Sequence, residues 1–223
     1  MNPTLETPKW IGKIQCACPG LRVSCSFEQV NYGVPQSWDR KTYYASARFC
    51  RAASFINTIN TEKTTVIITD ADQLFRKNIL SLLNPGVQKA YDIAIFDHLE
   101  TIPLASLYAK FGASFVAINS TASAKQYIRD VSFFIEKNLN RLACWTLDQI
   151  ALFTVAKLYN KNNTPISILK IPGEEITCAW DSNLNSTIWN SAGPCKFQIN
   201  TYTNTIRYFL RKYGFQTILK RYY

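Results

Sequence analysis

The sequence predicts an α/β fold, a single domain in which a mostly parallel central sheet is flanked by helices. Short apolar runs rich in β-branched residues, such as Thr64–Thr69 (TTVIIT), indicate strands that are buried on both faces. Longer stretches with apolar residues three and four positions apart indicate amphipathic helices, and these stretches alternate with the strands. The chain contains no clean linker, so one domain covering residues 1–223 is the simplest organisation.

The elements follow one another along the chain. Leu21–Phe27 alternates apolar and polar residues, as a half-buried strand does. We predict further strands at Thr64–Thr69, Tyr91–Asp97, Ser114–Asn119 and Ile166–Ile171, with Ile176–Trp180 as an additional candidate. We predict helices at Arg40–Thr58, Gln73–Leu83, Thr121–Lys137 and Trp145–Tyr159, and a basic C-terminal helix or tail within residues 197–223.

Apolar stripes on these helices predict which side chains face the core. The stripes are Ala45, Phe49, Ala52, Ala53 and Ile56 in the first helix; Ala124, Tyr127, Ile128, Val131, Phe134 and Ile135 in the third; and Leu147, Ile150, Ala151, Thr154, Val155 and Leu158 in the fourth. In the C-terminal helix the corresponding residues are Ile206, Phe209, Leu210 and Tyr213.

Composition excludes two classes of protein. With 47% hydrophobic and 18% charged residues, the chain is too apolar to be intrinsically disordered. No apolar run reaches the length of about 18 residues that a membrane span requires. The net charge is +10, and Asp181 is the last acidic residue. The basic C-terminal end indicates either an anionic partner or a solvated helix face.

Cysteine usage indicates the compartment. The seven cysteines are odd in number and lack the paired spacing of a zinc site. Several lie in apolar stretches, as buried free thiols do. The N-terminus, MNPTLETPKW, has no apolar signal core. We therefore expect a reduced, cytoplasmic protein without a signal peptide or transmembrane segment.

Two aspartates, Asp70 and Asp72, come directly after the strand Thr64–Thr69. In open α/β sheets, ligands bind beyond the carboxyl ends of the strands. Carboxylate oxygens suit Mn²⁺ or Mg²⁺, and diphosphate oxygens fill the remaining coordination positions. The structural alternative is that Asp72 caps a helix beginning at Gln73.

At this point the sequence resembles a known family. VIITDADQLF (Val66–Phe75) resembles the Asp-x-Asp segment of GT-A-type nucleotide-sugar glycosyltransferases, which have a Rossmann-like sheet. KTYYASARF (Lys41–Phe49) resembles the stretch that precedes this strand in a bacterial and viral branch of these enzymes. AINSTASAKQYIRDVSFFI, WTLDQIALF and IWNSAGPCK resemble later segments, in matching order up to residue 196.

The resemblance implies roles for the donor-binding residues. Asp70, Ala71 and Asp72 would form the donor segment, with Asp72 on the metal and Asp70 on the ribose or the metal shell. Arg48 would pair with phosphate or hold a carboxylate of the site; its alternative is a surface helix arginine. Gly193 would let the backbone approach the diphosphate, and Lys196 would neutralise its charge.

The resemblance also implies acceptor residues. Asp148 would be the general base of a direct displacement or would orient a sugar; its alternative is a favourable acid at a helix N-terminus. Asn119 and Gln149 would bind sugar. Two features depart from the family. The only histidine, His98, is not in the late position of the family's metal-ligand histidine, and residues 1–20 match no expected element.

The resulting hypothesis is a metal-dependent hexosyl- or deoxyhexosyltransferase. Its partners would be a UDP- or GDP-linked sugar, with Mn²⁺ or Mg²⁺, and a glycan or protein acceptor. Nucleic acid is not expected, while the basic C-terminus is a candidate for peripheral membrane contact. Two alternatives stay open. The net charge of +10 and the stretch RYFLRKYGF fit a nucleic-acid-binding protein, and Asp97 or Glu100 could complete a metal-dependent nuclease or phosphotransferase site.

Overall fold

The structure is a computed structural model of the chain. It describes residues 37–61, 64–70, 73–84, 90–97, 110–139, 141, 144–177 and 186–190, together with residues 12, 16, 20, 22, 23, 207, 208 and 211. Contacts divide the chain into two compact units, Met1–Pro35 and Gln36–Tyr223. Few residues of the first unit are described, so the single domain over residues 1–223 stays a prediction. Arg22 and Val23 lie in neither helix nor strand, and the rest of the predicted strand Leu21–Phe27 lies outside the described residues.

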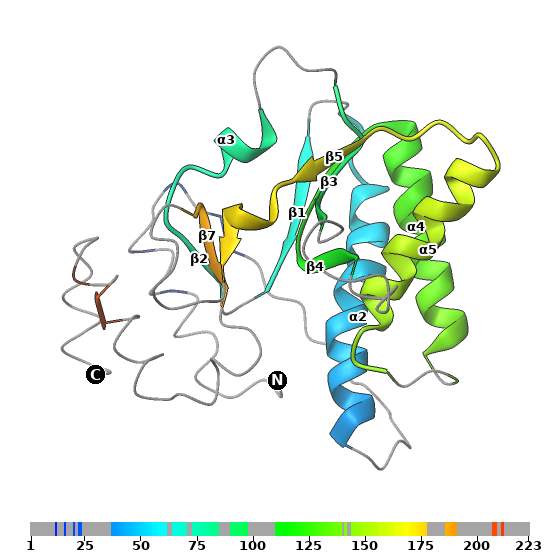
Figure 1. Cartoon of the computed structure of the whole chain (residues 1–223), viewed down its shortest axis with the longest axis horizontal. Coiled ribbons are helices and arrows are strands. Elements are labelled where there is room, and N and C mark those ends of the chain that lie inside the picture. Colours follow the sequence, from blue (N-terminus) through cyan, green and yellow to red (C-terminus); the bar gives the residue numbers. More distant parts are fainter. Residues whose placement is uncertain are drawn as a thin grey trace. The chain divides into compact units, whose positions relative to one another are not determined.

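Among the residues that the structure describes, the main sheet of the second unit has four strands in the order β1-β4-β3-β5. Its strands are β1 (Thr65–Thr69), β3 (Ile93–Asp97), β4 (Phe111–Asn119) and β5 (Ile168–Ile171). A smaller sheet has the order β2-β7-β6, with β2 (Gln73–Phe75), β6 (Ile176–Thr177) and β7 (Ile188–Asn190). Figure 1 shows both sheets and the helices around them. The predicted α/β class is therefore confirmed.

The main sheet is mixed rather than mostly parallel, which corrects the prediction. Strand β4 pairs antiparallel with both β1 and β3, and among the described neighbouring strands of this sheet only β3 and β5 pair in parallel. The apolar runs could not reveal this, because a strand buried on both faces has the same composition in either direction. As a consequence, β1, β3 and β5 point the same way, while β4 ends at the opposite edge of the sheet.

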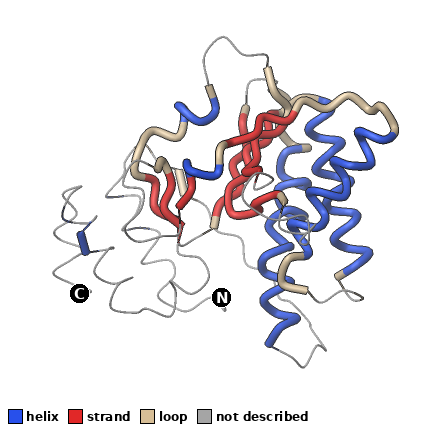
Figure 2. The backbone as a smooth tube through the Cα atoms, viewed as in Figure 1, coloured by secondary structure: helices blue, strands red, loops and turns tan. Residues whose placement is uncertain are grey.

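Three long helices cover one face of this sheet (Figure 2). They are α2 (Ser37–Ile56), α4 (Ala122–Asn138) and α5 (Leu147–Lys161), close to the predicted boundaries. Their stripes form one core with alternate residues of β3 and β4, including Ile93, Ile95, Val116 and Ile118. Most of the predicted inward residues are buried, but Leu158 is exposed, and Leu152 and Tyr159 are buried in the α5 helix.

The other face of the sheet packs a second core. Ala94, Phe96, Phe115 and Ala117 alternate with the residues of the first core along β3 and β4. They meet Leu82 and Leu83 of the short helix α3 (Leu80–Leu83), together with Ile171 and Ile188. A one-turn helix, η2 (Gly173–Glu175), leads into β6. Burial on both faces explains why these strands lack a polar alternation.

The predicted helix Gln73–Leu83 is wrong in its first half. Gln73–Phe75 forms strand β2, which pairs antiparallel with β7, and only Leu80–Leu83 is helical. The backbone N–H of Arg76 continues this pairing by donating to Thr187 O at 2.8 Å. The partner strand lies more than a hundred residues away in the chain, so local helical periodicity could not reveal the pairing. The structural alternative, in which Asp72 caps a helix beginning at Gln73, is therefore wrong, because Gln73 begins a strand.

The remaining predictions concern the C-terminus and membranes. Arg207, Tyr208 and Arg211 are helical, in agreement with a C-terminal helix, and the rest of residues 197–223 lies outside the described residues. The predicted strand at Ile176–Trp180 is present as β6 over its first two residues, and the others are not described. Among the helices that the structure describes, none is long and apolar enough for a membrane crossing.

Candidate functional site

Three charged side chains that the sequence analysis singled out meet at the carboxyl end of β1. Asp70 follows the last residue of this strand, and its N–H donates to Ser114 O of β4 at 3.0 Å. Arg48 comes from the middle of α2, and Asp148 from the first turn of α5. The fold thus brings together residues that are 22 and 100 positions apart in the sequence.

Arg48 bridges the two carboxylates. One terminal nitrogen, Nη1, forms an ion pair with Asp70 Oδ1, and the other, Nη2, donates to Asp148 Oδ2 at 3.1 Å. Its Nε donates to Ala45 O of the same helix at 2.9 Å, which fixes the direction of the guanidinium. Arginine suits this position because its planar group keeps several donors in a fixed arrangement. We call Asp70, Arg48 and Asp148 the carboxylate clamp.

Burial differs strongly between the two acids of the clamp. The Asp148 side chain is 5% exposed, whereas that of Asp70 is 33% exposed. Burial raises the pKa of Asp148 above its ordinary value, and the nearby Asp70 carboxylate adds to this effect. Arg48 and the Gln149 N–H, which donates to Asp148 Oδ1 at 2.8 Å, act in the opposite direction. Asp148 is therefore a buried acid with its charge supported from two sides.

Gln73 is a neighbour of the clamp. The sequence pattern predicted it to be the first residue of a helix. Its N–H donates to Asp70 O at 3.4 Å, and its Oε1 accepts a hydrogen bond from Thr69. Its Nε2 is buried and has no hydrogen-bond partner within the described part of the chain. Gln73 also pairs in β2 with Asn190, which is itself buried. In the sequence, its position directly after Asp72 was the only sign that Gln73 lies close to the clamp.

Asn119, a predicted sugar-binding residue, does not join the clamp. It ends the antiparallel strand β4 and pairs with Thr65 at the amino end of β1. Five residues of β1 separate this position from Asp70, a distance of about 17 Å along an extended strand. The Asn119 amide donates to Tyr91 O at 2.7 Å and accepts from Thr65 Oγ1 at 2.6 Å. The structure therefore places Asn119 at the opposite edge of the sheet, where it joins strands.

Of the other predicted residues, some are described by the structure and some are not. Gln149 lies in the first turn of α5 beside Asp148 and is partly buried. Ala71, Asp72, Gly193, Lys196 and His98 lie outside the described residues. The nuclease alternative named Asp97 or Glu100 as a further carboxylate. The Asp97 side chain is 8% exposed at the end of β3 and pairs with Lys170 Nζ at 2.7 Å, whereas Glu100 lies outside the described residues.

One carboxylate of the clamp is the type of ligand that binds a hard metal ion. Asp70 presents a partly exposed carboxylate at the end of β1, and carboxylate oxygens are the ligands that Mn²⁺ and Mg²⁺ prefer. Within the part of the chain that the structure describes, no three His, Cys, Asp or Glu residues form a group that could hold a metal. Of the residues that the structure describes, Asp70 is the member of the clamp whose carboxylate is exposed enough to bind a metal.

Comparisons with known proteins identify no family for this chain. No protein-family model matches the chain, and no curated protein matches it.

Proposed function

We propose that the chain is a metal-dependent glycosyltransferase that moves a hexosyl or deoxyhexosyl group from a UDP- or GDP-linked sugar to a glycan or protein acceptor. The observation that carries this proposal is the carboxylate clamp at the carboxyl end of β1. Arg48, Asp70 and Asp148 come from three of the segments whose order along the chain resembles that of nucleotide-sugar glycosyltransferases. Their meeting at the carboxyl end of β1 supports a site in which the expected donor residues Arg48 and Asp70 lie beside the expected acceptor residue Asp148.

The metal would be held by Asp70 and Asp72. When bound, Mn²⁺ or Mg²⁺ would neutralise the charge of the departing nucleoside diphosphate. The argument for a metal here rests on Asp70, whose carboxylate is partly exposed. Arg48 forms an ion pair with its Oδ1. Lys196 is a candidate for the same electrostatic task from the C-terminal side of the chain.

In this proposal, Asp148 is the general base. The acceptor hydroxyl oxygen forms a bond to the anomeric carbon while the bond from that carbon to the diphosphate oxygen breaks. The proton of the hydroxyl passes to Asp148, and the nucleoside diphosphate leaves with the electron pair. A buried acid with a raised pKa suits this role, because a base works best when its pKa approaches the operating pH. Arg48 holds the carboxylate in place.

A thermal-stability experiment tests donor binding. The protein is heated with Mn²⁺ and one of UDP-glucose, UDP-galactose, GDP-mannose or a short DNA duplex. A ligand at 100 times its Kd stabilises a fold by about 2.7 kcal/mol, so a true donor raises the midpoint clearly. Asp72→Ala should abolish the Mn²⁺-dependent shift. A midpoint that responds to the DNA and to no sugar nucleotide would remove the proposal in favour of nucleic-acid binding.

A kinetic experiment tests the role of Asp148. With the donor identified, Asp148→Asn should lower kcat by about 10²–10⁴-fold and abolish the acidic limb of the pH–rate profile. If only KM changes and the acidic limb persists, Asp148 orients a sugar and is not the base. Lys170→Met is a suitable control, because Lys170 forms an ion pair with Asp97 rather than with the clamp.

A further inference from the structure

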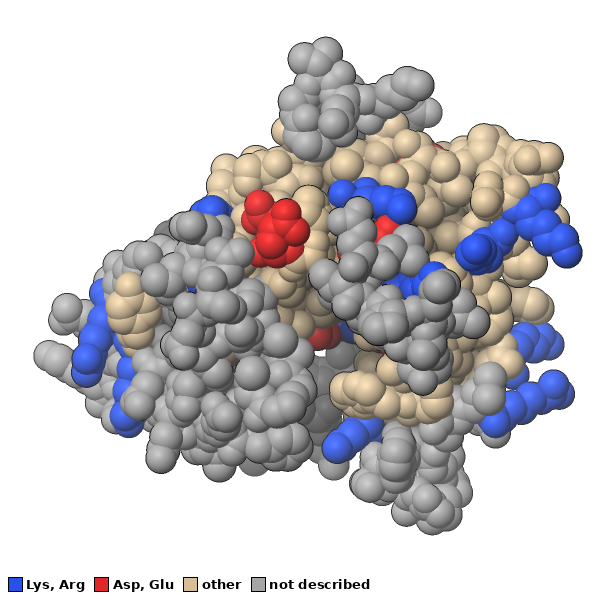
Figure 3. All heavy atoms as spheres, in the orientation of Figure 1, with Lys and Arg blue, Asp and Glu red and all other residues tan. Residues whose placement is uncertain are grey.

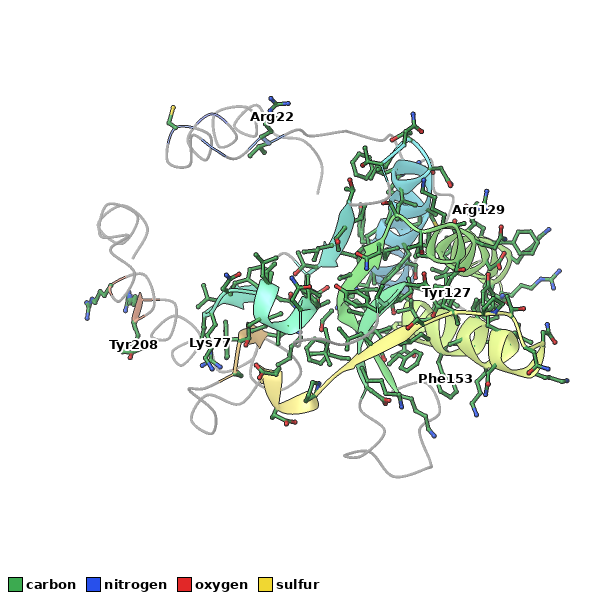
Figure 4. The ribbon with its side chains drawn as sticks, turned by 90° about the horizontal axis from the view of Figure 1, so that it is seen from above. Arg22, Lys77, Tyr127, Arg129, Phe153 and Tyr208 are labelled. Carbon is green, nitrogen blue, oxygen red and sulfur yellow. The ribbon has the colours of Figure 1, made fainter. Side chains whose placement is uncertain are left out.

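Residues of helices α4 and α5 line a groove that includes no residue of the carboxylate clamp. The groove encloses about 550 Å³, within the range of about 300–1,000 Å³ that is usual for small-molecule sites. Its walls include Phe133 and Lys137 of α4 and Leu158 and Tyr159 of α5. Figure 4 labels Tyr127 and Arg129 on α4 and Phe153 on α5, the two helices that form it.

An aromatic ring is the main apolar feature of this groove. Phe133 is 60% exposed although other residues of α4 are fully buried, and Leu158 of α5, which lines the same groove, is 48% exposed. The sequence stripe predicted Leu158 to face the core, so its exposure is a departure from the helical pattern. Lys137 Nζ lies 5.3 Å from the centre of the Phe133 ring. The ring is therefore oriented by a neighbour, and no described element covers it.

A pre-arranged polar row lies beside the ring. Asp130 accepts hydrogen bonds from Gln126 Nε2 at 2.9 Å and from Tyr159 Oη at 2.6 Å. Arg129 in turn donates to Gln126 Oε1 at 2.7 Å. A carboxylate has about four acceptor positions, so Asp130 retains capacity for about two further donors. Because its neighbours hold it in place, it can offer these positions to a ligand without reorganisation.

We infer that this groove binds a neutral oligosaccharide, in addition to any sugar at the carboxylate clamp. A hexose presents a face of C–H bonds, whose slight positive charge is attracted to the negative face of an aromatic ring such as Phe133. Its hydroxyl groups donate to a carboxylate such as Asp130 and accept from amides such as Gln126. The groove places these complementary groups side by side.

Two other occupants fit the groove less well. Lys and Arg side chains gather on the side of α4 and α5 (Figure 3), which would attract an anionic membrane. The lining of the groove, however, includes the carboxylate of Asp130 as well as Lys137, and a membrane would bring its phosphates against that carboxylate. A protein partner would need about 800 Å² of buried surface on each side. Of the lining residues, Phe133 and Leu158 are the exposed large apolar side chains, and together they offer far less.

The test is a binding titration by ligand-observed NMR on the full chain. The probes are maltohexaose, cellohexaose and chitohexaose, each up to 10 mM, in the absence of metal and sugar nucleotide. We expect at least one of them to bind the wild-type protein with a millimolar Kd. Phe133→Ala should raise that Kd at least tenfold, and Asp130→Asn at least threefold.

Phe55→Ala is the matched control, because Phe55 is 58% exposed on α2 and does not line the groove. It should change the Kd less than twofold, and the thermal midpoint of each variant verifies its fold. Asp148→Asn should retain oligosaccharide binding, so a failure of the proposed transferase function leaves this test intact. The inference is overturned if none of the three probes binds, or if Phe133→Ala binds as the wild type does. It is also overturned if Phe133 is needed only for binding to phosphatidylcholine vesicles that contain 30 mol% phosphatidylserine.

Discussion

At the scale of single residues, the decisive feature is Arg48. On sequence alone it could be a surface arginine of a helix or a charge in a site. Its side chain is 22% exposed and contacts carboxylates from two other segments, so it holds the clamp together. Without Arg48, the carboxylates of Asp70 and Asp148 would repel each other, because both contact the same guanidinium group.

Removal of the Arg48 charge should therefore be costly. We expect Arg48→Met to lower the free energy of unfolding at pH 7 by about 3 kcal/mol, because it leaves a buried carboxylate without its cation. Urea denaturation of Arg48→Met, Asp148→Asn and the double variant measures this. The double variant should lose less than the sum of the single losses, by about 1 kcal/mol or more. Strictly additive losses would contradict a direct coupling of Arg48 and Asp148.

The buried Asp148 should also make stability depend on pH. Its pKa is raised in the folded state above the ordinary value of 3.8, mainly by burial, so the native protein keeps a proton that the unfolded chain releases. The contribution of Asp148 to stability is then greatest below about pH 4 and is lost as the pH rises through the raised pKa. The asparagine of the Asp148→Asn variant does not titrate, so this variant should not lose stability in that pH range through residue 148.

Urea unfolding of both proteins between pH 4 and pH 8 checks this prediction. The free energy of unfolding of the wild type minus that of Asp148→Asn should become more negative as the pH increases. Two curves that stay parallel across the range would mean that burial does not raise the pKa of Asp148.

At the scale of elements, the N-termini of α4 and α5 differ in a way that can be measured. Thr121 caps α4: its Oγ1 accepts from the Ala124 N–H at 3.1 Å and donates to Asp92 of the loop before β3. Thr146 occupies the same position in α5 but makes no side-chain capping bond. The same residue type therefore has different energetic importance in two neighbouring helices.

We expect Thr121→Ala to destabilise the protein by about 1 kcal/mol, because it leaves the Ala124 N–H without its cap and removes the donor to Asp92 Oδ1, although Asp92 Oδ2 still accepts from the Ser167 N–H. Thr146→Ala is the matched control and should cost only a few tenths of a kcal/mol. Thermal and urea unfolding of the two variants provide the comparison. Equal losses in the two variants would contradict the capping role of Thr121.

At the scale of the whole second unit, the two sheets share one apolar layer. Phe115 of β4 is fully buried and packs against Phe96 of β3, with ring centres 6.2 Å apart. It also packs against Phe75 of β2 in the small sheet, with ring centres 6.3 Å apart. Phe115 thus joins the main sheet to the strand that follows the candidate metal-binding aspartates.

We expect Phe115→Ala to lower the free energy of unfolding by about 3–5 kcal/mol, because it opens a cavity between the sheets. Phe75→Ala should cost about 1 kcal/mol, since Phe75 is already 40% exposed. Both variants should still unfold in a single transition. A second transition in Phe115→Ala, seen by circular dichroism and by tryptophan fluorescence, would show that the two sheets are not one cooperative unit.

Sequence patterns located most of the second unit correctly. The strands at residues 65–69 and 93–97 and the three long helices lie close to their predicted positions, because local periodicity and continuous apolar runs determine such elements. Asp70 was singled out by its place directly after a buried strand, and Arg48 and Asp148 by the resemblance of the segments that contain them; the structure brings the three side chains together. Strand direction was not accessible in this way, nor was the conversion of Gln73–Phe75 into a strand that pairs with residues more than a hundred positions away.

The sequence by itself therefore determined the elements, the faces they bury and the charged residues worth testing. Only the tertiary structure decided which of those residues meet. Because β4 runs antiparallel, its carboxyl end carries Asn119 to the edge opposite Asp70, whereas α2 and α5 bring Arg48 and Asp148 to Asp70. Contacts between distant segments depend on strand direction and helix packing, and these are properties of the assembled core rather than of any local stretch.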